Sequence, residues 1–295
     1  MSNTTSRGIS LFALSYLAAT LVDAPAKYLL AHGMPLQTVI FWRYAIALGA
    51  LVALFVARRQ KPARSRSIKT NLLRGALLTA STFVNFYAIS HLPLSLAVTI
   101  NFAAPLISCA LAPFILDEHV GPRRWAAVLV GFLGVVIVMR PGSQGFHPAM
   151  LASLFNALLM ALYQIFTRKA GMKDAPETGL LWVFALGSTI TTLGLFATPL
   201  AWQPLPIELW PWALVMGAAG LATHIIVSHA LRLAPASLLA PFGYTQMIWM
   251  TLSGIVLFDN WPDHQTLLGA AVIVGSGIYV WHRERVLGVE RGAIE

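Results

Sequence analysis

Long apolar runs separated by short polar turns make up nearly the whole chain. Each run contains roughly 20 residues, the length of an α-helix that crosses the hydrocarbon core of a bilayer. Gly and Pro mark the turns, as in HGMP at 32–35 and RPG at 140–142. The pattern predicts an all-α integral membrane protein with ten transmembrane helices, at residues 9–31, 35–57, 71–91, 94–116, 121–139, 148–168, 178–200, 208–232, 236–258 and 264–282.

Basic residues are distributed very unevenly between the two sides of these spans. Of the 20 Lys and Arg residues, Lys27 and Arg43 lie inside predicted spans, and Arg140 alone lies in a turn opposite the N-terminus. The other 17 fall on the side of the N-terminus. Because loops rich in Lys and Arg remain in the cytoplasm, the sequence predicts that both termini are cytoplasmic. The first run continues to full spanning length, so we expect a span there and not a cleaved signal peptide.

Composition narrows the class of protein further. The chain has 295 residues, of which 57% are hydrophobic and 11% charged, whereas a soluble domain is about a quarter charged. A bilayer accommodates this much apolar sequence, and lipid is therefore an expected partner. A sequence pI near 10.1 is typical of nucleic-acid binding only where basic residues cluster on a soluble face. Here they lie in short loops, so no nucleic-acid partner is expected. The single cysteine, Cys109, excludes a disulfide framework.

The second half of the chain repeats the first. The stretch His91–Arg140 returns, altered, at Leu233–Arg283. LPLSL in the first copy corresponds to APASL in the second, and Asp117 corresponds to Asp259 at an offset of 142 residues. A one-residue shift then aligns the ends of the two copies. A period of about half the chain indicates a duplicated unit and not a solenoid.

Five spans per copy is an odd number, so the second copy must lie upside down relative to the first. Inverted repeats are the architecture of many secondary transporters, whose sites lie at the midplane between the halves. The pattern predicts two five-helix units, at 9–140 and 147–283, and favours transport. Two alternatives remain open at this point. One is an inverted pair that merely dimerises, and the other is a membrane-embedded enzyme or lipid-handling protein without solute transport.

Two segments resemble the repeat cores of a known family. They are NFAAPL…LDEHVGPRRWAAVLVGFLGVVIVMRPG and LAPASLLAPFGYTQMIW…FDNWPD…TLLGA. The sequence is similar to the EamA family of ten-span carriers in the drug/metabolite transporter superfamily, over nearly the whole chain. That resemblance implies a bacterial inner-membrane carrier with a central cavity between its halves. One departure is that Asp117-Glu118 and Asp259-Asn260 stand where the family usually has one Glu, which weakens any special role for the second carboxylate.

Three further stretches resemble one bacterial subgroup of that family. They are DAPAKYLL at 23–30, PLQTVIFWRY at 35–44 and APFGYTQMIW at 240–249. The subgroup includes riboflavin importers, S-adenosylmethionine carriers and exporters of opine-type metallophores, and the family also holds exporters of amino acids. The resemblance implies a small organic solute without choosing among these.

Charged side chains inside spans are costly and are by default functional candidates. Asp23, Lys27 and Arg43 are the clear cases. Asp23 and Lys27 are four residues apart on one helix face, and Asp23 and Arg43 lie at similar depths below the outer ends of their spans, so all three are expected in one layer. They would form a charged gate or a clamp for an anionic substrate, with Asp23 responding to protons. The alternative is a buried ion-pair cluster that holds the first two helices together. For Arg43 this structural role is the favoured interpretation. Pro25 is expected to kink the first helix between the two charges.

The third and eighth spans offer polar side chains at corresponding positions. Asn85 and Tyr87 lie in the third span, and His224 and His229 lie in the eighth. The two histidines are five residues apart and point about 140° apart around a helix, so no metal site is expected. His229 corresponds to Tyr87, which favours a pair facing the cavity. A histidine satisfied within the core is the alternative.

The fourth and ninth spans supply aromatic and amide groups beside the expected repeat axis. Asn101 corresponds to Gly243 and Phe102 to Tyr244, with Gln246 two residues further on. Aromatic rings with a few fixed polar groups are typical of a pocket for a small molecule, and Asn or Gln bonding between helices is the alternative. The sixth span adds weaker candidates, Asn156, Tyr163 and Gln164.

Small residues at Gly131, Gly134, Gly269 and Gly275–Gly277 indicate tight packing of the fifth and tenth helices, against a neighbour or in a homodimer.

No nucleotide-binding motif is present, and we expect no cofactor. The sequence thus predicts a non-enzymatic inner-membrane secondary transporter of a small organic metabolite, working by alternating access. The predicted substrate-binding residues are Asp23, Lys27, Arg43, Asn85, Tyr87, Asn101, Phe102, Tyr163, Gln164, His229, Tyr244 and Gln246.

Overall fold

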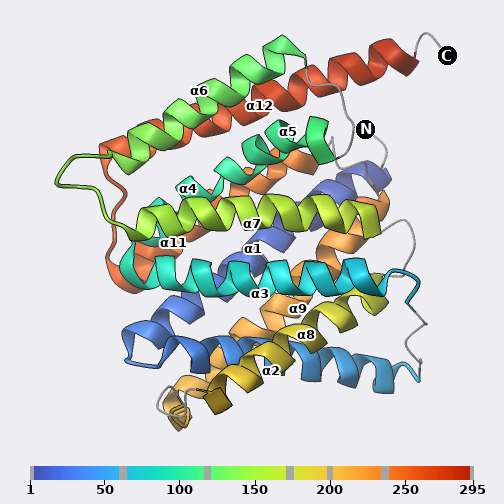
Figure 1. Ribbon diagram of the computed structural model, residues 1–295, viewed down its shortest axis with the longest axis vertical. Helices are drawn as coiled ribbons and strands as arrows, with labels where there is room; N and C mark the ends of the chain where they lie inside the picture. Colours follow the sequence, from blue (N-terminus) through green and yellow to red (C-terminus); the bar gives the residue numbers. More distant parts are fainter. Residues whose placement is uncertain are drawn as a thin grey trace.

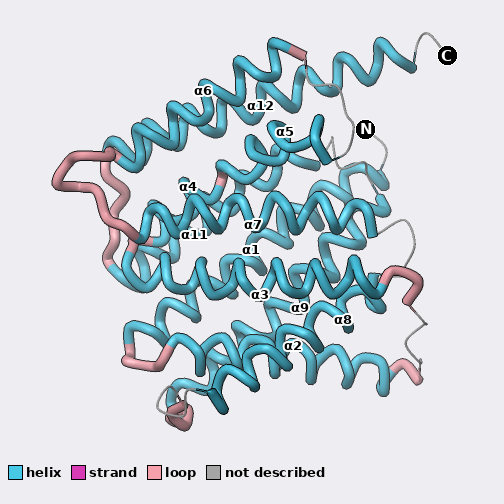
Figure 2. Tube along the Cα trace, in the orientation of Figure 1, coloured by secondary structure: helices cyan, strands magenta, loops and turns pink. Residues whose placement is uncertain are grey.

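A computed structural model describes residues 3–59, 65–115, 121–170, 176–197, 202–233 and 239–292. Within these ranges the chain contains helices and no strand (Figure 1; Figure 2). The α-helices are α1 (Asn3–Ala31), α2 (Leu36–Ala57), α3 (Ile68–His91), α4 (Leu94–Asn101), α5 (Ala103–Ile115), α6 (Pro122–Met139), α7 (Ala149–Ala170), α8 (Pro176–Ala197), α9 (Trp210–Leu233), α11 (Thr245–Phe258) and α12 (His264–Gly292). Two short 3₁₀ helices are η2 (Ile207–Leu209) and η3 (Ala240–Tyr244).

Eight helical segments in the described ranges are long and apolar enough to cross a membrane. Each of the first eight predicted spans coincides with one of them. The ninth coincides with a shorter apolar helix, Phe242–Phe258, and the tenth with α12. The chain is therefore a multi-pass, all-helical membrane protein, and the total of ten crossings stays a prediction.

The fourth predicted span is interrupted within the membrane-spanning segment Leu94–Leu111. Phe102 separates α4 from α5, which pack as two pieces. The physical reason is Pro105, in the first turn of α5: it has no N–H to donate to the carbonyl of Asn101 four residues earlier. In the second copy η3 gives way to α11 at Tyr244, the residue that corresponds to Phe102. Pro25, in contrast, lies within α1 and does not end it.

The two halves of the chain run in opposite directions. α1 starts on the side where both termini lie, whereas α7, the first helix of the second half, starts on the other side (Figure 1). The turns at 32–35, 140–148 and 259–263 all lie on the side opposite the termini, spread along the long axis (Figure 1; Figure 2).

Contacts between the halves follow a two-fold pattern. α1 packs on α9 as α3 packs on α7, α2 packs on α9 as α3 packs on α8, and α1 packs on α11 as α4 and α5 pack on α7. Three further pairs, α2 with α8, α4 with α11 and α6 with α12, join helices that correspond to each other. Exchanging the halves leaves these contacts unchanged, whereas the smaller contacts of α12 with α4 and α5 have no counterpart of similar extent.

Glycines hold α6 and α12 close together along their length (Figure 1). A Cβ added to Gly269 would lie 2.8 Å from the carbonyl oxygen of Gly134 and would overlap Val138. Ser276 of α12 donates to the carbonyl of Ala127 at 2.8 Å. Of the two packing partners expected for these small-residue faces, the structure shows the neighbouring helix.

An ion pair joins this helix pair at the ends that lie opposite the chain termini (Figure 1). Arg140, directly after α6, contacts the carboxylate of Asp263, directly before α12. Asp263 also accepts the backbone N–H of Thr266 at 2.7 Å and so caps the helix. Partial desolvation opposes the shift, but the bonds from Arg140 and Thr266 lower the pKa of Asp263 from 3.8 to about 2.

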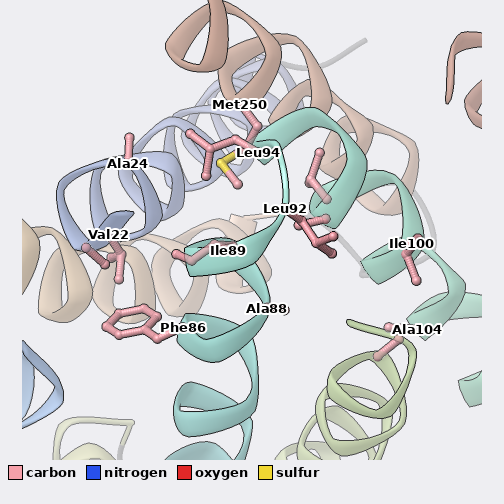
Figure 3. Packing of buried hydrophobic residues seen from close by; sticks show 14 of the residues in the cluster. Val22, Ala24, Phe86, Ala88, Ile89, Leu92, Leu94, Ile100, Ala104 and Met250 are labelled. Atoms are coloured by element: carbon pink, nitrogen blue, oxygen red, sulfur yellow. The ribbon is translucent and has the colours of Figure 1, made fainter. Parts of the chain in front are cut away.

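Apolar side chains pack densely where α3 turns into α4. Leu92 and Leu94 form this turn, and Met250 of α11 and Ala24 of α1 approach it from the other elements (Figure 3). Ile89 and Phe86 extend the same cluster along α3 (Figure 3). This packing fixes α1 against α3, and the polar residues described next lie on these two helices.

Candidate functional site

A carboxylate and an amide meet between α1 and α3. Asn85 donates from Nδ2 to Asp23 Oδ1 at 2.9 Å. Both side chains are partly exposed although they lie well inside their spans. Asp23 lies eight residues, roughly 12 Å, from the end of α1 at Ala31. A carboxylate at this depth is costly unless it serves a purpose or finds partners, and Asn85 supplies one partner.

Asn85 is also the centre of a larger hydrogen-bonded network. Its Oδ1 accepts from Asn101 at 3.1 Å and from Asn156 at 3.4 Å. Asn156 donates in addition to Asn101 Oδ1 at 3.0 Å and accepts from Ser81 Oγ at 2.5 Å. The network therefore links α1, α3, α4 and α7, and so connects the two halves of the chain through Asn156.

The network ends at the break in the fourth span. Asn101 is the last residue of α4, and the ring of the next residue, Phe102, lies 5.0 Å from that of Tyr244. The structure thus brings together the two aromatic residues that correspond in the repeats. Tyr244 also lies against α12, where a Cβ on Gly277 would overlap its hydroxyl. Interrupted helices are typical of transporter binding sites.

Lys27 is held at the C-terminal end of α3. Its ammonium group donates to the carbonyls of Ile89 at 2.8 Å and Leu92 at 2.5 Å, and it lies 5.4 Å from the centre of the Phe258 ring. Carbonyls at the C-terminal end of α3 are the negative end of a helix dipole. Lys27 thereby fastens α1 to the end of α3.

Arg43 is buried in α2, with only 8% of its surface exposed. Its Nη1 donates to Thr82 Oγ1 on α3 at 2.6 Å. The guanidinium carbon lies 5.0 Å from the ring centre of Tyr44 and 5.8 Å from that of Phe86. Its Nε is buried and has no hydrogen-bond partner among the described residues. Arg43 is therefore anchored without a counter-ion in contact.

The three charged residues expected in one layer do not form an ion-pair cluster. Among the described residues, no nitrogen of Lys27 or Arg43 lies within 4.0 Å of an oxygen of Asp23. A buried ion pair between α1 and α2 is thus not what holds these side chains, because each bonds to α3 or to its end.

A second polar group lies between α3, α7 and α9. Arg74 donates to Asn71 Oδ1 and to Thr167 Oγ1, both at 2.9 Å, and its guanidinium lies 5.6 Å from the Tyr163 ring. Tyr163 is 3.5 Å from Nδ1 of His224. Tyr163 is therefore placed apart from the network around Asn85, even though Asn156 shares its helix.

The remaining candidates lie nearer the surface of the molecule. Tyr87 and His229 are both exposed, and each is bonded only locally: Tyr87 contacts His91 of its own helix, and His229 bonds to the carbonyl of Ile225. Gln164 is exposed and Gln246 is half-buried. Within the described ranges, no group of three His, Cys, Asp or Glu side chains is arranged to hold a metal.

Comparison with known proteins decides the family. The EamA-like transporter family model matches residues 6–140 and 147–281, which is almost the entire chain and both of its halves. This chain belongs to the EamA-like transporter family. Membership makes it a membrane transport protein and not an enzyme.

Curated relatives of this transporter match over nearly their full length. A Rickettsia bellii protein named as an S-adenosylmethionine uptake transporter is 28% identical over 286 residues, which are 96% of each chain. A Vibrio cholerae protein named as a riboflavin transporter is 28% identical over 270 residues, covering 90% of this chain and 89% of that protein. A solved crystal structure with 18% identity and a TM-score of 0.67 covers 97% of this chain and 99% of its own, and shows a shared fold.

Several polar residues of the site were not among the predicted set. Thr82 and His224 contact the predicted residues Arg43 and Tyr163. Ser81 bonds to Asn156, which was a weaker candidate and which joins the network through Asn101. Ser and Thr are common in membrane helices, where most bond to their own backbone. Their spacing along α3 at 81, 82 and 85 is the signal that places them on the side of Asn85.

Proposed function

We propose that this protein is a secondary transporter of a small organic metabolite in the bacterial inner membrane. It crosses the membrane ten times with both termini in the cytoplasm, and its substrate site lies between two inverted five-helix repeats, about 9–140 and 147–283, that open alternately to either side. The two-fold pattern of helix contacts and the concentration of basic residues on the side of the termini support this proposal.

The observation that carries the proposal is the network of Asp23, Asn85, Asn101 and Asn156. It joins four helices from both halves at the depth of a broken helix. A polar network inside the membrane is costly, and such networks mark the path of a substrate or ion. The rings of Phe102 and Tyr244 adjoin it and offer a surface for stacking.

The names of the relatives support a solute with a planar ring system. Their names specify S-adenosylmethionine and riboflavin, and both molecules combine a flat heterocycle with polar groups. Aromatic side chains beside a few fixed polar groups fit this chemistry. The buried positive charge of Arg43 suits a solute that carries a carboxylate better than a simple cation.

Asp23 is the residue through which protons would drive the transport. It is the only acidic residue in the interior of a predicted span. While ionised it can only accept hydrogen bonds, which orients the Asn85 amide with its NH₂ toward the carboxylate. A protonated Asp23 can donate a hydrogen bond, so the Asn85 amide no longer has to present its NH₂ to it. The hydrogen bonds of the network can therefore rearrange when Asp23 binds a proton.

The test is transport into sealed vesicles that contain purified protein. Asp23→Asn preserves shape and the bond to Asn85 but removes the proton site, and we expect it to abolish accumulation while expression and melting stay near wild type. Asp259→Asn, the same change in an exposed turn, is the matched control and should transport normally. A large loss of folded Asp23→Asn protein would show instead that the carboxylate is structural. Chemical conversion of a solute without a sealed compartment would overturn transport as the function.

A further inference from the structure

The hydroxyl end of the Tyr244 ring lies against the backbone of α12. A Cβ added to Gly277 would overlap the Tyr244 hydroxyl, and it would lie 2.8 Å from Cζ and 3.4 Å from Cε2 of the same ring. All three of the nearest atoms that such a Cβ would meet belong to Tyr244. Among the described residues the hydroxyl has no hydrogen-bond partner. The space at Gly277 therefore accommodates the ring, and packing alone holds the ring there.

The corresponding glycine of the first copy serves a different purpose. Gly134 corresponds to Gly277 in the repeat. A Cβ on Gly134 would lie 3.0 Å from the carbonyl oxygen of Gly269 and 2.9 Å from Ile273, both on α12. Close packing of α6 on α12 thus explains the small residue at 134. At 277 the neighbour is a side chain of the proposed substrate site, so helix packing does not explain the glycine there.

The ring that rests on Gly277 is also one half of an aromatic pair. Its centre lies 5.0 Å from that of Phe102, and the two planes meet at 48°. Phe102 is buried between α4 and α5, whereas Tyr244 remains partly exposed. Because the Tyr244 ring touches α12 at its hydroxyl and Phe102 at its side, a displacement at the first contact changes the second. The residue at 277 therefore controls the geometry of the pair.

We propose that Gly277 is a positioning residue for the substrate, because the space that it leaves sets the separation and tilt at which Tyr244 and Phe102 receive a planar heterocycle. The inference rests on the proposed transport function, and it gives α12 a part in selecting the substrate ring. A side chain at 277 would force Tyr244 to withdraw. Shifts of about 1 Å forfeit much of a van der Waals contact, so ring-bearing solutes would bind less tightly and solutes without a ring would be little affected.

A matched pair of ligands isolates the contribution of the ring. S-adenosylhomocysteine and S-ribosylhomocysteine differ only in that a hydroxyl replaces the adenine, and riboflavin carries a larger ring system. Dissociation constants are measured on the purified protein in nanodiscs. We expect Gly277→Ala to weaken binding of S-adenosylhomocysteine and riboflavin about tenfold and that of S-ribosylhomocysteine less than about threefold. Gly275→Ala, the same change at a position with nothing within 4 Å, is the matched control and should bind all three ligands like the wild type.

Removing the hydroxyl tests whether the effect passes through Tyr244. Tyr244→Phe deletes the atom that the new Cβ would overlap and leaves only the approach to Cζ at 2.8 Å. The double variant Gly277→Ala/Tyr244→Phe should therefore bind both ring-bearing ligands within about threefold of Tyr244→Phe alone. It should also melt at a higher temperature than Gly277→Ala. This comparison still decides if Gly277→Ala fails to fold, because an equal failure of the double variant would overturn the inference.

The outcomes separate this inference from the proposed function. Equal binding of the ring-bearing ligands by the wild type and Gly277→Ala would overturn the role of Gly277 and leave transport standing. Equal weakening of all three ligands would overturn it too, since the effect would not depend on the ring. Failure of the wild type to bind either ring-bearing ligand would contradict the proposed substrate class, and the role of Gly277 with it.

Discussion

Replacing Asn85 by Leu removes the centre of the polar network while keeping a side chain that branches at the same carbon. Asp23 then loses its bonded amide, and Asn101 and Asn156 each lose an acceptor. Asn156 keeps a second acceptor in Asn101, so its loss is partial. The substitution therefore changes three hydrogen bonds between helices without changing the helix itself.

The expected cost follows from the worth of such bonds inside a membrane. They average about 0.6 kcal/mol each and reach about 1.7 kcal/mol. For three bonds we expect Asn85→Leu to lower the free energy of unfolding by about 2 kcal/mol, with an upper limit of about 5 kcal/mol. Thr79→Val is the control variant, because buried Thr79 bonds only to the carbonyl of Gly75 in its own helix and makes no hydrogen bond between helices. Its expected cost is less than about 0.5 kcal/mol.

Reversible unfolding in mixed micelles, followed by helix content at increasing fractions of denaturing detergent, measures both variants. Asn85→Leu should also lose transport in vesicles, whereas Thr79→Val should keep it. Equal unfolding free energies for the two variants would refute the network as a stabilising contact between helices. Full transport activity in Asn85→Leu would refute its place in the substrate path.

Two further predictions concern the packing of α12 on α6 and the ion pair between Arg140 and Asp263. Gly269→Ala should destabilise the protein by about 1–3 kcal/mol, because its Cβ overlaps Val138, whereas Gly275→Ala, with nothing within 4 Å, should be neutral or mildly stabilising; melting of the two variants compares them. The lowered pKa of Asp263 means that its bond to Arg140 stabilises the fold above pH 4 and is lost as the pH falls toward 2. Asp263→Asn keeps a capping side chain, so its melting temperature should fall less than that of the wild type over this interval. A parallel fall in both proteins would exclude the ion pair as the cause.

The sequence could predict the first eight spans and the duplication because both depend on patterns along the chain. Apolar length identifies a span without reference to its neighbours, and an odd number of spans per copy dictates inversion. The break at Phe102 has a readable cause in Pro105, but a proline in the first turn of a helix and a proline inside one look alike in the sequence. Pro25 shows the difficulty, since α1 continues through it.

The partners of the polar residues were not predictable in the same way. Asn85 and Asn101 are conspicuous in apolar spans, but their bonds depend on how far each helix is rotated and shifted against the next. Asp23 and Lys27 share a face of α1, yet they bond to different parts of α3. Side-chain spacing within one helix fixes direction, whereas the distance to a residue on another helix is a property of the whole fold.

The two-fold pattern of contacts has a consequence for biogenesis. α1 finds its main partner in α9 and α3 finds its own in α7, so the first half has few of its final contacts when it leaves the ribosome. Asp23 and Arg43 have their hydrogen-bond partners within the first half, on α3, but α1 and α3 lack their main packing partners until the second half is inserted. Each half expressed alone should accordingly be degraded. The two halves expressed together should reach a stable level, because each half supplies the main packing partners of the other.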